Sequence, residues 1–326
     1  MSSFTLNFAT EKDLYKWDAL VSQSYNGTLF HKRKFLSYHG DKFKGQDRFL
    51  VFRKGEIIKG LIAIAIDDLQ KDVARSTYGA SYGGVVLMEK PTYSSSLSII
   101  NTLMHWIQDQ GINDFSMTAP IGVCSTYGVD VFSFTLLEQG FKSISRDISS
   151  VVRLNNPNKS VIDAMTGNAR NMSRKALKNG LIINHDVCVD VFYPILQNTY
   201  AKHGTCPTHT IDELKLLNNM FESEVRCHVA MLGSLPVAGI CEFIMNNRVN
   251  SSFYFCQLQA YKKLQGLSLL VYDALDRAEK SGFSYYDFGT STTAMSANAA
   301  VFKFKESYGA FGVFRETFNW SNRVDQ

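Results

Sequence analysis

The chain has 326 residues, 45% of them hydrophobic, and its 34 basic and 30 acidic side chains give a formal net charge of +4. This length exceeds one ordinary hydrophobic core and predicts two domains of roughly 150 residues each. The mild positive charge suits anionic ligands but gives no indication of DNA binding. No apolar run reaches the roughly 18 residues of a membrane span, and the first ten residues lack the basic and apolar regions of a secretion signal.

The six cysteines predict a reducing compartment and no metal site. None of them forms a CxxC pair, and most lie in apolar, strand-like runs, where cysteine packs as a small hydrophobic residue. A cytoplasmic protein without a zinc site is the simplest interpretation.

The first half of the chain predicts helices, an antiparallel hairpin and then alternating helices and strands. The spacing of apolar residues predicts helices or strands in the following order. Helices are expected at 11–23 and near 35–38, two strands at 47–67 with a turn at Lys54-Gly55, an extended glycine-rich segment at 73–87, a helix at 96–110, a strand at 112–120, a helix at 131–139 and a strand at 148–154.

The second half repeats this order after the polar segment "NNPNKS". Helices are expected at 161–180, 191–204 and 210–221, a three-strand meander at 225–258, a helix at 267–281, a strand at 283–289 and a helix at 297–308.

The two halves resemble each other in sequence. The segment "SLSIINTLMHWIQDQGINDF" aligns with "LSLLVYDALDRAEKSGFSYYDF" at an offset of about 170 residues, which suggests a duplicated domain. The expected fold is α+β, with a mixed, largely antiparallel sheet flanked by helices in each of two domains, 1–154 and 155–326.

The segment "KLQGLS" follows the meander and opens the next helix. It resembles the Q/R-x-x-G-x-G/A loop of the GNAT acyltransferases, with Lys263 in place of Gln or Arg and Ser268 in place of the last small residue. In that family, backbone N–H groups of the loop and the helix N-terminus hold the pyrophosphate of coenzyme A. The resemblance implies an acyl-CoA site, acetyl-CoA first among the donors, formed by Lys263, Gln265, Gly266, Leu267 and Ser268.

Two observations qualify this donor site. An ordinary strand-to-helix turn would also explain the segment, with Gly266 providing a positive φ. The equivalent segment of the first half, "PTYSSSL", has neither a glycine nor a basic residue, so we expect a degenerate first domain and a donor in the second.

The C-terminal segments "YYDFGTS" and "NAAVFKFKESYGA" resemble the closing segment of the FemAB-like acyltransferases. The segments "ARNMSRKALKNGLII", "HGTCPTHT" and "YGASYGGVV" resemble others of that family. The resemblance implies tandem GNAT-like domains and acyl transfer to an amine or hydroxyl of a cell-envelope sugar or peptide precursor, with Lys305 close to the reacting carbonyl. A cation there would stabilise the oxyanion or protonate the leaving group. The alternative is a solvated lysine at a helix C-terminus.

Two carboxylates are candidate catalytic groups. Asp287 ends a strand, where open sheets present their sites, and could orient the acceptor or act as a base; a turn aspartate is the alternative. Glu242 is a lone carboxylate in an apolar strand, which is costly unless it is paired or faces a cleft. It is the preferred general base, and the alternative is the solvent face of an edge strand.

Further residues are candidates for substrate binding because they lie on loops, on the strand before the donor loop or on a basic helix face. They are His203, Thr205, Tyr254, Gln257, Arg170, Arg174 and Tyr82. The alternatives are core packing for Tyr254, a bulged strand at Tyr82, and solvated surfaces for the loop and the helix face.

The sequence therefore predicts a GNAT-type N-acyltransferase without a metal, acting on a small-molecule or nucleotide- or lipid-linked sugar. The acceptor amine would attack the thioester directly. Relatives that use aminoacyl-tRNA are commonly longer and have a helical arm, and no long heptad pattern is present here. An aminoacyl-tRNA-dependent enzyme acting on a peptidoglycan precursor and a non-catalytic scaffold remain the alternatives, and tRNA is a partner only in the first of these.

Overall fold

The structure is a computed structural model that describes residues 4–76, 78–202 and 204–323. The chain divides into two compact units. Unit 1 comprises Met1–Asp147 with Phe314–Gln326, and unit 2 comprises Ile148–Val313. The predicted division between residues 154 and 155 differs from this one. The observed boundaries between the units fall inside two long strands, β7 (Lys142–Arg153) and β15 (Phe311–Ser321), and each strand gives residues to both units.

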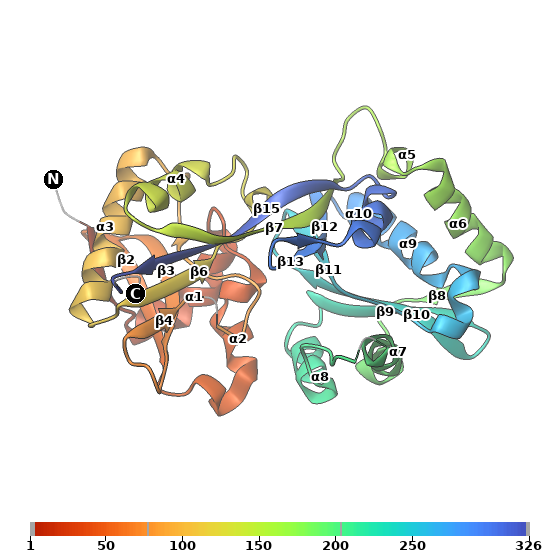
Figure 1. The fold of residues 1–326 in the computed structure, drawn as a ribbon, viewed down its shortest axis with the longest axis horizontal. Helices are drawn as coiled ribbons and strands as arrows, with labels where there is room; N and C mark the ends of the chain where they lie inside the picture. Colours follow the sequence, from red (N-terminus) through yellow and green to blue (C-terminus); the bar gives the residue numbers. More distant parts are fainter. Residues whose placement is uncertain (1–3, 77, 203, 324–326) are drawn as a thin grey trace. The chain divides into compact units, whose positions relative to one another are not determined.

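Unit 1 is built on a mixed sheet with helices on both faces (Figure 1). Its strands lie in the order β1 (Phe4–Phe8), β2 (Asp47–Lys54), β3 (Ile57–Ile66), β4 (Val73–Arg75), β6 (Asp114–Thr118) and β15, and β5 (Val86–Leu87) pairs with β3. Neighbouring strands are antiparallel except β4 and β6, which are parallel.

The alternation of side chains along β2 explains the two layers of helices. Leu50 and Phe52 pack in the core beneath α3 (Tyr93–Asp109) and α4 (Asp130–Glu138). Val51 points to the opposite face and packs with residues of α1 (Glu11–Gln23). The short helices α2 (Arg33–Leu36), η1 (Leu29–His31), η2 (Ser37–Phe43) and η3 (Gly122–Cys124) complete this unit.

Unit 2 repeats the plan of unit 1. Its strands lie in the order β7, β12 (Tyr285–Thr290), β11 (Val249–Gln257), β10 (Leu235–Ile244), β9 (Val225–Leu232) and β8 (Leu181–Asn184). The single parallel pair among these neighbours is β11 with β12. In each unit the chain runs from one parallel strand to the other through a crossover helix. This helix is α3 in unit 1 and α9 (Gly266–Lys280) in unit 2.

The helices of unit 2 also form two layers. One layer shares a core with the sheet and consists of α5 (Val161–Ala164), α6 (Gly167–Lys178), α9 and α10 (Ala299–Glu306). On the other side of the sheet lie α7 (Val189–Ala201) and α8 (Ile211–Met220) (Figure 1). The predicted fold class, a mixed and largely antiparallel sheet with flanking helices in each half, is confirmed.

Several elements were not predicted. They are the long strand β15, the short strands β1 and β8, and the hairpin of β13 (Thr292–Thr293) and β14 (Ser296–Ala297). The helix expected at 161–180 is broken in two, because Met165 is extended and the Thr166 side chain caps the second helix. No helix in the described part of the chain is long and apolar enough to cross a membrane.

Candidate active site

Lys305 is a buried lysine at the end of α10 in unit 2. The side chain of Asn298 caps the start of this helix, and Gly309, at φ +86°, reverses the chain beyond it. Lys305 is 5% exposed. Its Nζ donates to the carbonyl oxygens of Gly289 (2.8 Å) and Thr290 (2.7 Å), which leaves one of its three N–H groups uncommitted among the described residues. The alternative of a solvated surface lysine does not agree with this burial.

Burial sets the protonation of Lys305. It lowers the pKa of this side chain to about 8, and the negative charge of Asp287 partly offsets the effect. A lysine with such a pKa is still mainly a cation at neutral pH, yet gives up its proton far more easily than a surface lysine. Lys305 is therefore suited to stabilising developing negative charge or to donating a proton.

Asp287 lies on β12, beside the carbonyls that hold Lys305. Its Oδ1 accepts hydrogen bonds from the Ser149 hydroxyl (2.6 Å) and from the N–H of Gly289 (2.8 Å). The second bond closes an Asx turn, and Gly289 takes φ +71° there. Asp287 thus shapes the end of β12, as the turn alternative expected, and supplies negative charge near Lys305. Its role as a base or in orienting the acceptor stays a prediction.

The predicted donor loop joins β11 to α9. The 3-10 helix η4 (Gln259–Leu264) ends at Gln265, which is left-handed with φ +66° and is the N-cap of α9 without a side-chain cap. The first N–H groups of α9 therefore have neither an intrahelical acceptor nor a side-chain cap. Lys263 is exposed beside them, Leu267 is half-buried, and Ser268 donates to the Gln265 side chain (3.1 Å).

The role of Gly266 differs from the alternative drawn from the sequence. The positive φ belongs to Gln265, and Gly266 lies in the helix itself. A Cβ on Gly266 would stand 3.1 Å from the Cβ of Ala238 and 3.4 Å from that of Ala230. The glycine is needed because the start of α9 approaches the sheet this closely.

Tyr308 connects the end of α10 to this loop and was not among the predicted site residues. It is 1% exposed and packs edge-to-face with Phe304 and Phe288. Its hydroxyl is buried without a regular hydrogen bond in the described part of the chain. Burial raises the pKa of Tyr308, and the Ser268 hydroxyl partly offsets this, so the two hydroxyls face the same space. An aromatic residue directly before a glycine that ends a helix was the sequence signal.

Glu242 forms a saturated buried network, which argues against its predicted role as general base. Its Oε1 accepts from Asn250 (3.0 Å) and the Tyr286 hydroxyl (2.8 Å), and its Oε2 accepts from His228 (2.9 Å) and Arg277 (3.0 Å). A carboxylate has about four lone-pair sites, so none remains for a substrate proton. Burial raises the pKa of Glu242, but its bonds to His228 and Arg277 outweigh burial and hold the pKa below its usual value.

The tautomer of His228 follows from its two partners. Its Nδ1 accepts from the backbone N–H of Asp186 (3.1 Å), so the ring proton lies on Nε2 and is donated to Glu242. Glu242 is neither at the solvent face of an edge strand nor available as a base. It holds β9, β10, β11, β12 and α9 together.

The predicted substrate residues of the second half lie in different surroundings. Tyr254 is a core residue whose hydroxyl pairs with His209 Nδ1 (2.8 Å) and accepts from the His209 N–H (3.1 Å). Gln257 is half-buried at the end of β11 and bonds Thr199 through its backbone. Thr205 is exposed, and His203 lies outside the described residues.

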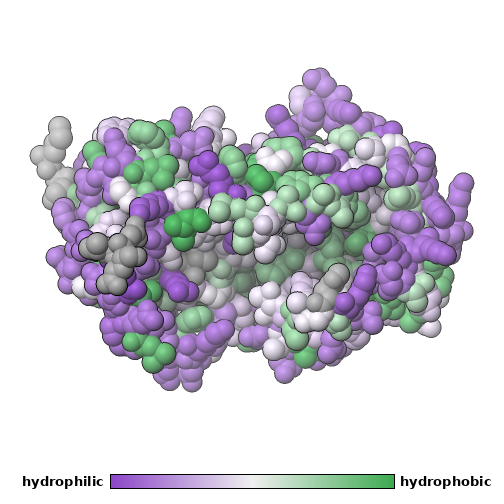
Figure 2. All heavy atoms as spheres, viewed as in Figure 1, coloured by the Kyte–Doolittle hydropathy of each residue, from purple (hydrophilic) through white to green (hydrophobic). Residues whose placement is uncertain are grey.

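The two predicted arginines of α6 also differ from each other. One guanidinium nitrogen of Arg170 donates to the carbonyls of Ile162 (3.2 Å) and Met165 (3.0 Å) and so ties α5 to α6. Arg174 is exposed, and hydrophilic residues dominate the surface around α5 and α6 on the face drawn in Figure 2. Only Arg174 is available to a phosphate without loss of a structural contact.

Tyr82 belongs to unit 1, not to the unit of Lys305. It is buried, packs edge-to-face with Phe30 and lies beneath the guanidinium of Arg315 at 5.3 Å from the ring centroid. Arg315 also donates to the carbonyl of Ser81 (2.7 Å). Within the described ranges, no group of three His, Cys, Asp or Glu side chains could hold a metal ion.

Comparisons with known proteins support this architecture. The crystal structure of FemX matches with a TM-score of 0.72 at 12% identity, over 97% of each chain. L-PGS from Bacillus licheniformis matches with a TM-score of 0.59 at 12% identity, over 98% of this chain and 94% of that one. A tandem GNAT protein from the clavulanic acid biosynthesis pathway matches with a TM-score of 0.55 at 10% identity, over 99% of both chains.

At these identities the likeness establishes the fold. The chain has the tandem GNAT-like, FemAB-like fold that its motifs resembled. No protein-family model matches the sequence, and no curated protein matches it either.

Proposed function

We propose that the chain is a cytoplasmic acyltransferase that moves an acyl group from acyl-CoA, acetyl-CoA first among the donors, to the amine of an amino sugar or a related cell-envelope polysaccharide precursor. The neutral acceptor amine forms a bond from its nitrogen to the thioester carbonyl carbon, the carbon–sulfur bond breaks, the nitrogen releases one proton to solvent, and the thiolate takes up one proton. The observation on which this rests is Lys305, a buried lysine whose pKa is lowered to about 8 and whose ammonium is held by two backbone carbonyls.

The residues around Lys305 have separate roles in this proposal. The ammonium of Lys305 stabilises the oxyanion that forms on the acyl carbonyl. The carboxylate of Asp287 keeps the lysine charged and fixes the end of β12. The buried hydroxyl of Tyr308, near the donor loop, protonates the departing thiolate.

The donor belongs at the start of α9. The N–H groups of its first turn are not capped by a side chain, and exposed Lys263 adds positive charge beside them. Both features favour a pyrophosphate.

Thermal unfolding with millimolar acetyl-CoA tests this assignment. A ligand of the native state at about 100 times its Kd adds roughly 2.7 kcal/mol of stability. Lys263→Glu should remove most of the shift, and the adjacent Lys262→Glu is the matched control on the same exposed turn. Gly266→Glu is less suitable, because Gly266 is buried against Ala238 and the variant would unfold for packing reasons.

A second candidate is an aminoacyl-tRNA-dependent transferase. The likeness to FemX and the exposed basic side chains of α6, Arg174, Lys175 and Lys178, favour it. Binding of charged tRNA that falls steeply between 50 and 200 mM salt, without any effect of acyl-CoA, would support it. No effect of either donor would favour the third candidate, a non-catalytic scaffold.

A further inference from the structure

The outer face of α3 in unit 1 is open where its counterpart in unit 2 is covered. In unit 2, α6 packs along α9. The helix equivalent to α9 in the repeat is α3, which packs against α4 and β1. Within the described residues, no helix of unit 1 takes the place of α6 on α3.

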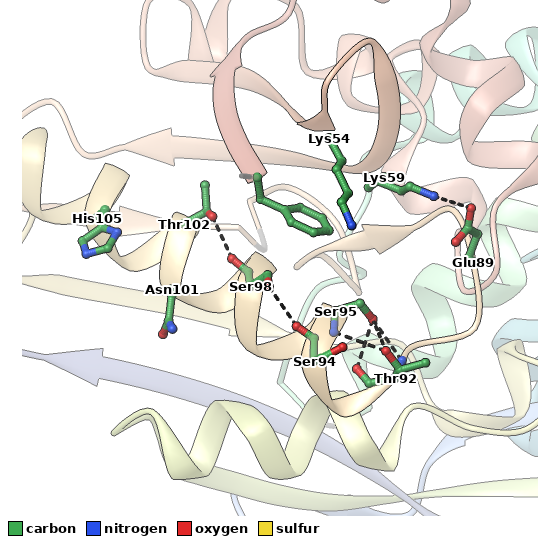
Figure 3. Close-up of a pocket in the computed structure, with 11 residues that line it drawn as sticks. Lys54, Lys59, Glu89, Thr92, Ser94, Ser95, Ser98, Asn101, Thr102 and His105 are labelled. Atoms are coloured by element: carbon green, nitrogen blue, oxygen red, sulfur yellow. Dashed lines mark hydrogen bonds and ion pairs between the residues drawn. The ribbon is translucent and has the colours of Figure 1, made fainter. Parts of the chain in front are cut away.

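A cavity of about 720 Å³ lies along this open face. Figure 3 shows the side chains of Ser98, Asn101 and Thr102 along α3, and Lys54, Lys59 and Glu89 across from its N-terminal turns. Phe4, at the start of β1, adds an aromatic ring to the lining. The volume lies within the range of about 300–1,000 Å³ that small-molecule sites occupy.

The hydroxyl groups on α3 present acceptors to this cavity. Ser98 Oγ donates its proton to the carbonyl of Ser94 (2.9 Å), Thr102 Oγ1 donates to that of Ser98 (2.7 Å), and Ser95 Oγ donates to that of Thr92 (3.0 Å). A hydroxyl has one proton and two lone pairs, so Ser98 and Thr102 keep only lone pairs for a ligand, whereas the Ser95 hydroxyl already accepts from the N–H and the hydroxyl of Thr92 (3.0 Å each). Asn101, whose amide both donates and accepts, lines the same wall, which therefore suits a ligand that donates as well as accepts hydrogen bonds.

The opposite wall offers a donor and an aromatic face. The Lys54 ammonium stands 5.8 Å from the centre of the Phe4 ring. Lys59 is paired with Glu89 at 2.6 Å, so its charge is already neutralised. A polyanion would meet the Lys54 ammonium, but it would also lie near the Ser98 and Thr102 oxygens, whose protons are committed, and near the carboxylate of Glu89.

We propose that this cavity binds a neutral glycan segment. A sugar hydroxyl both donates and accepts, so it matches the α3 hydroxyls and Lys54 together. The C–H face of a pyranose ring packs on an aromatic ring such as Phe4. This inference does not rest on the proposed activity, because the site lies in unit 1 and binding is measured without any acyl donor.

The test is a glycan array that includes neutral and polyanionic oligosaccharides, probed with the full-length protein. Saturation-transfer NMR then measures the affinity of the strongest neutral ligand. Ser98→Glu fills part of the cavity with a longer, charged side chain, and Phe4→Ala removes the aromatic face. We expect each to weaken binding at least tenfold. Gln108→Glu, an exposed change on α3 outside the cavity, is the matched control and should leave binding unchanged.

Three results would overturn the proposal. They are the absence of any neutral glycan signal on the array, binding that survives both cavity variants, and a preference for polyanionic oligosaccharides or inorganic phosphate. Melting curves of both variants identify any that does not fold, and Phe4→Ala answers the question alone if Ser98→Glu unfolds.

Discussion

Replacing Glu242 with glutamine should destabilise unit 2, because this side chain is a structural hub. The carboxylate is 2% exposed and accepts four hydrogen bonds from four side chains. Glutamine keeps one carbonyl oxygen but turns an NH2 group toward two of those donors. His228 cannot adapt, because its Nδ1 already accepts from the backbone of Asp186.

The size of the effect follows from the buried donors that lose their acceptor. Arg277 is 28% exposed and keeps its ion pair with Asp273 (2.7 Å), so the loss is smaller than for a fully buried pair, and a buried donor left unsatisfied costs about 1–3 kcal/mol. With roughly 2–4 °C per kcal/mol for a unit of this size, the melting temperature should fall on the order of 5 °C. This exceeds the roughly 0.5 kcal/mol expected of an exposed substitution.

Urea unfolding followed by circular dichroism measures this loss. Glu222→Gln, at an exposed glutamate of unit 2, is the matched control and should unfold like the wild type. The reasoning is refuted if Glu242→Gln has wild-type stability and yet abolishes acyl transfer. In that case Glu242 would be the general base that the sequence predicted.

Five further outcomes are expected. Lys305→Ala should lower kcat/KM by about 100-fold or more, whereas exposed Lys303→Ala should leave it unchanged; equal effects would refute a specific role. If the Lys305 cation acts in transfer, kcat/KM of the wild type should fall as pH rises through about 8. Folding lowers the pKa of Lys305 from 10.5 to about 8. Between these two values the unfolded chain binds more protons than the folded chain, so the free energy of unfolding should increase with pH. Urea titrations should show this slope in the wild type and lose it in Lys305→Met. Because the pKa of Glu242 is lowered, its contribution should be present above its unfolded pKa and lost as pH falls through the folded one, which acid titration of unfolding measures. Tyr308→Phe should slow transfer with little change in stability, since its hydroxyl has no regular hydrogen bond to lose among the residues that the structure describes; unchanged turnover would exclude it as the acid.

The elements that the sequence predicted are those with strong local signals. The helices now seen as α1, α3 and α9 have clear 3.6-residue periodicity, and α3 and α9 end before glycines at positive φ. The duplicated order of helices and strands also follows from pattern alone. Strands such as β1 and β8 are short and lack such a signal, so they were missed.

The candidate site residues also differ in how far the sequence alone could indicate them. Lys305 could be singled out because its segment, "NAAVFKFKESYGA", resembles the closing segment of the FemAB-like acyltransferases. The network of Glu242 could not, because its partners come from β9, β11, β12 and α9, far apart in the sequence. The need for glycine at 266 was likewise hidden, since it arises from the approach of α9 to β9 and β10.

The C-terminal strand has a consequence for the order of folding during synthesis. Residues 317–321 of β15 pair with β6, and Phe318 is buried in the core of unit 1. Unit 1 is therefore assembled from two pieces of chain, with all of unit 2 between them. A ribosome makes nearly all of unit 2 before it delivers the last strand of unit 1, so unit 1 keeps an incomplete sheet edge during that time. A nascent chain in this state would be a natural client for chaperones that cover exposed strands.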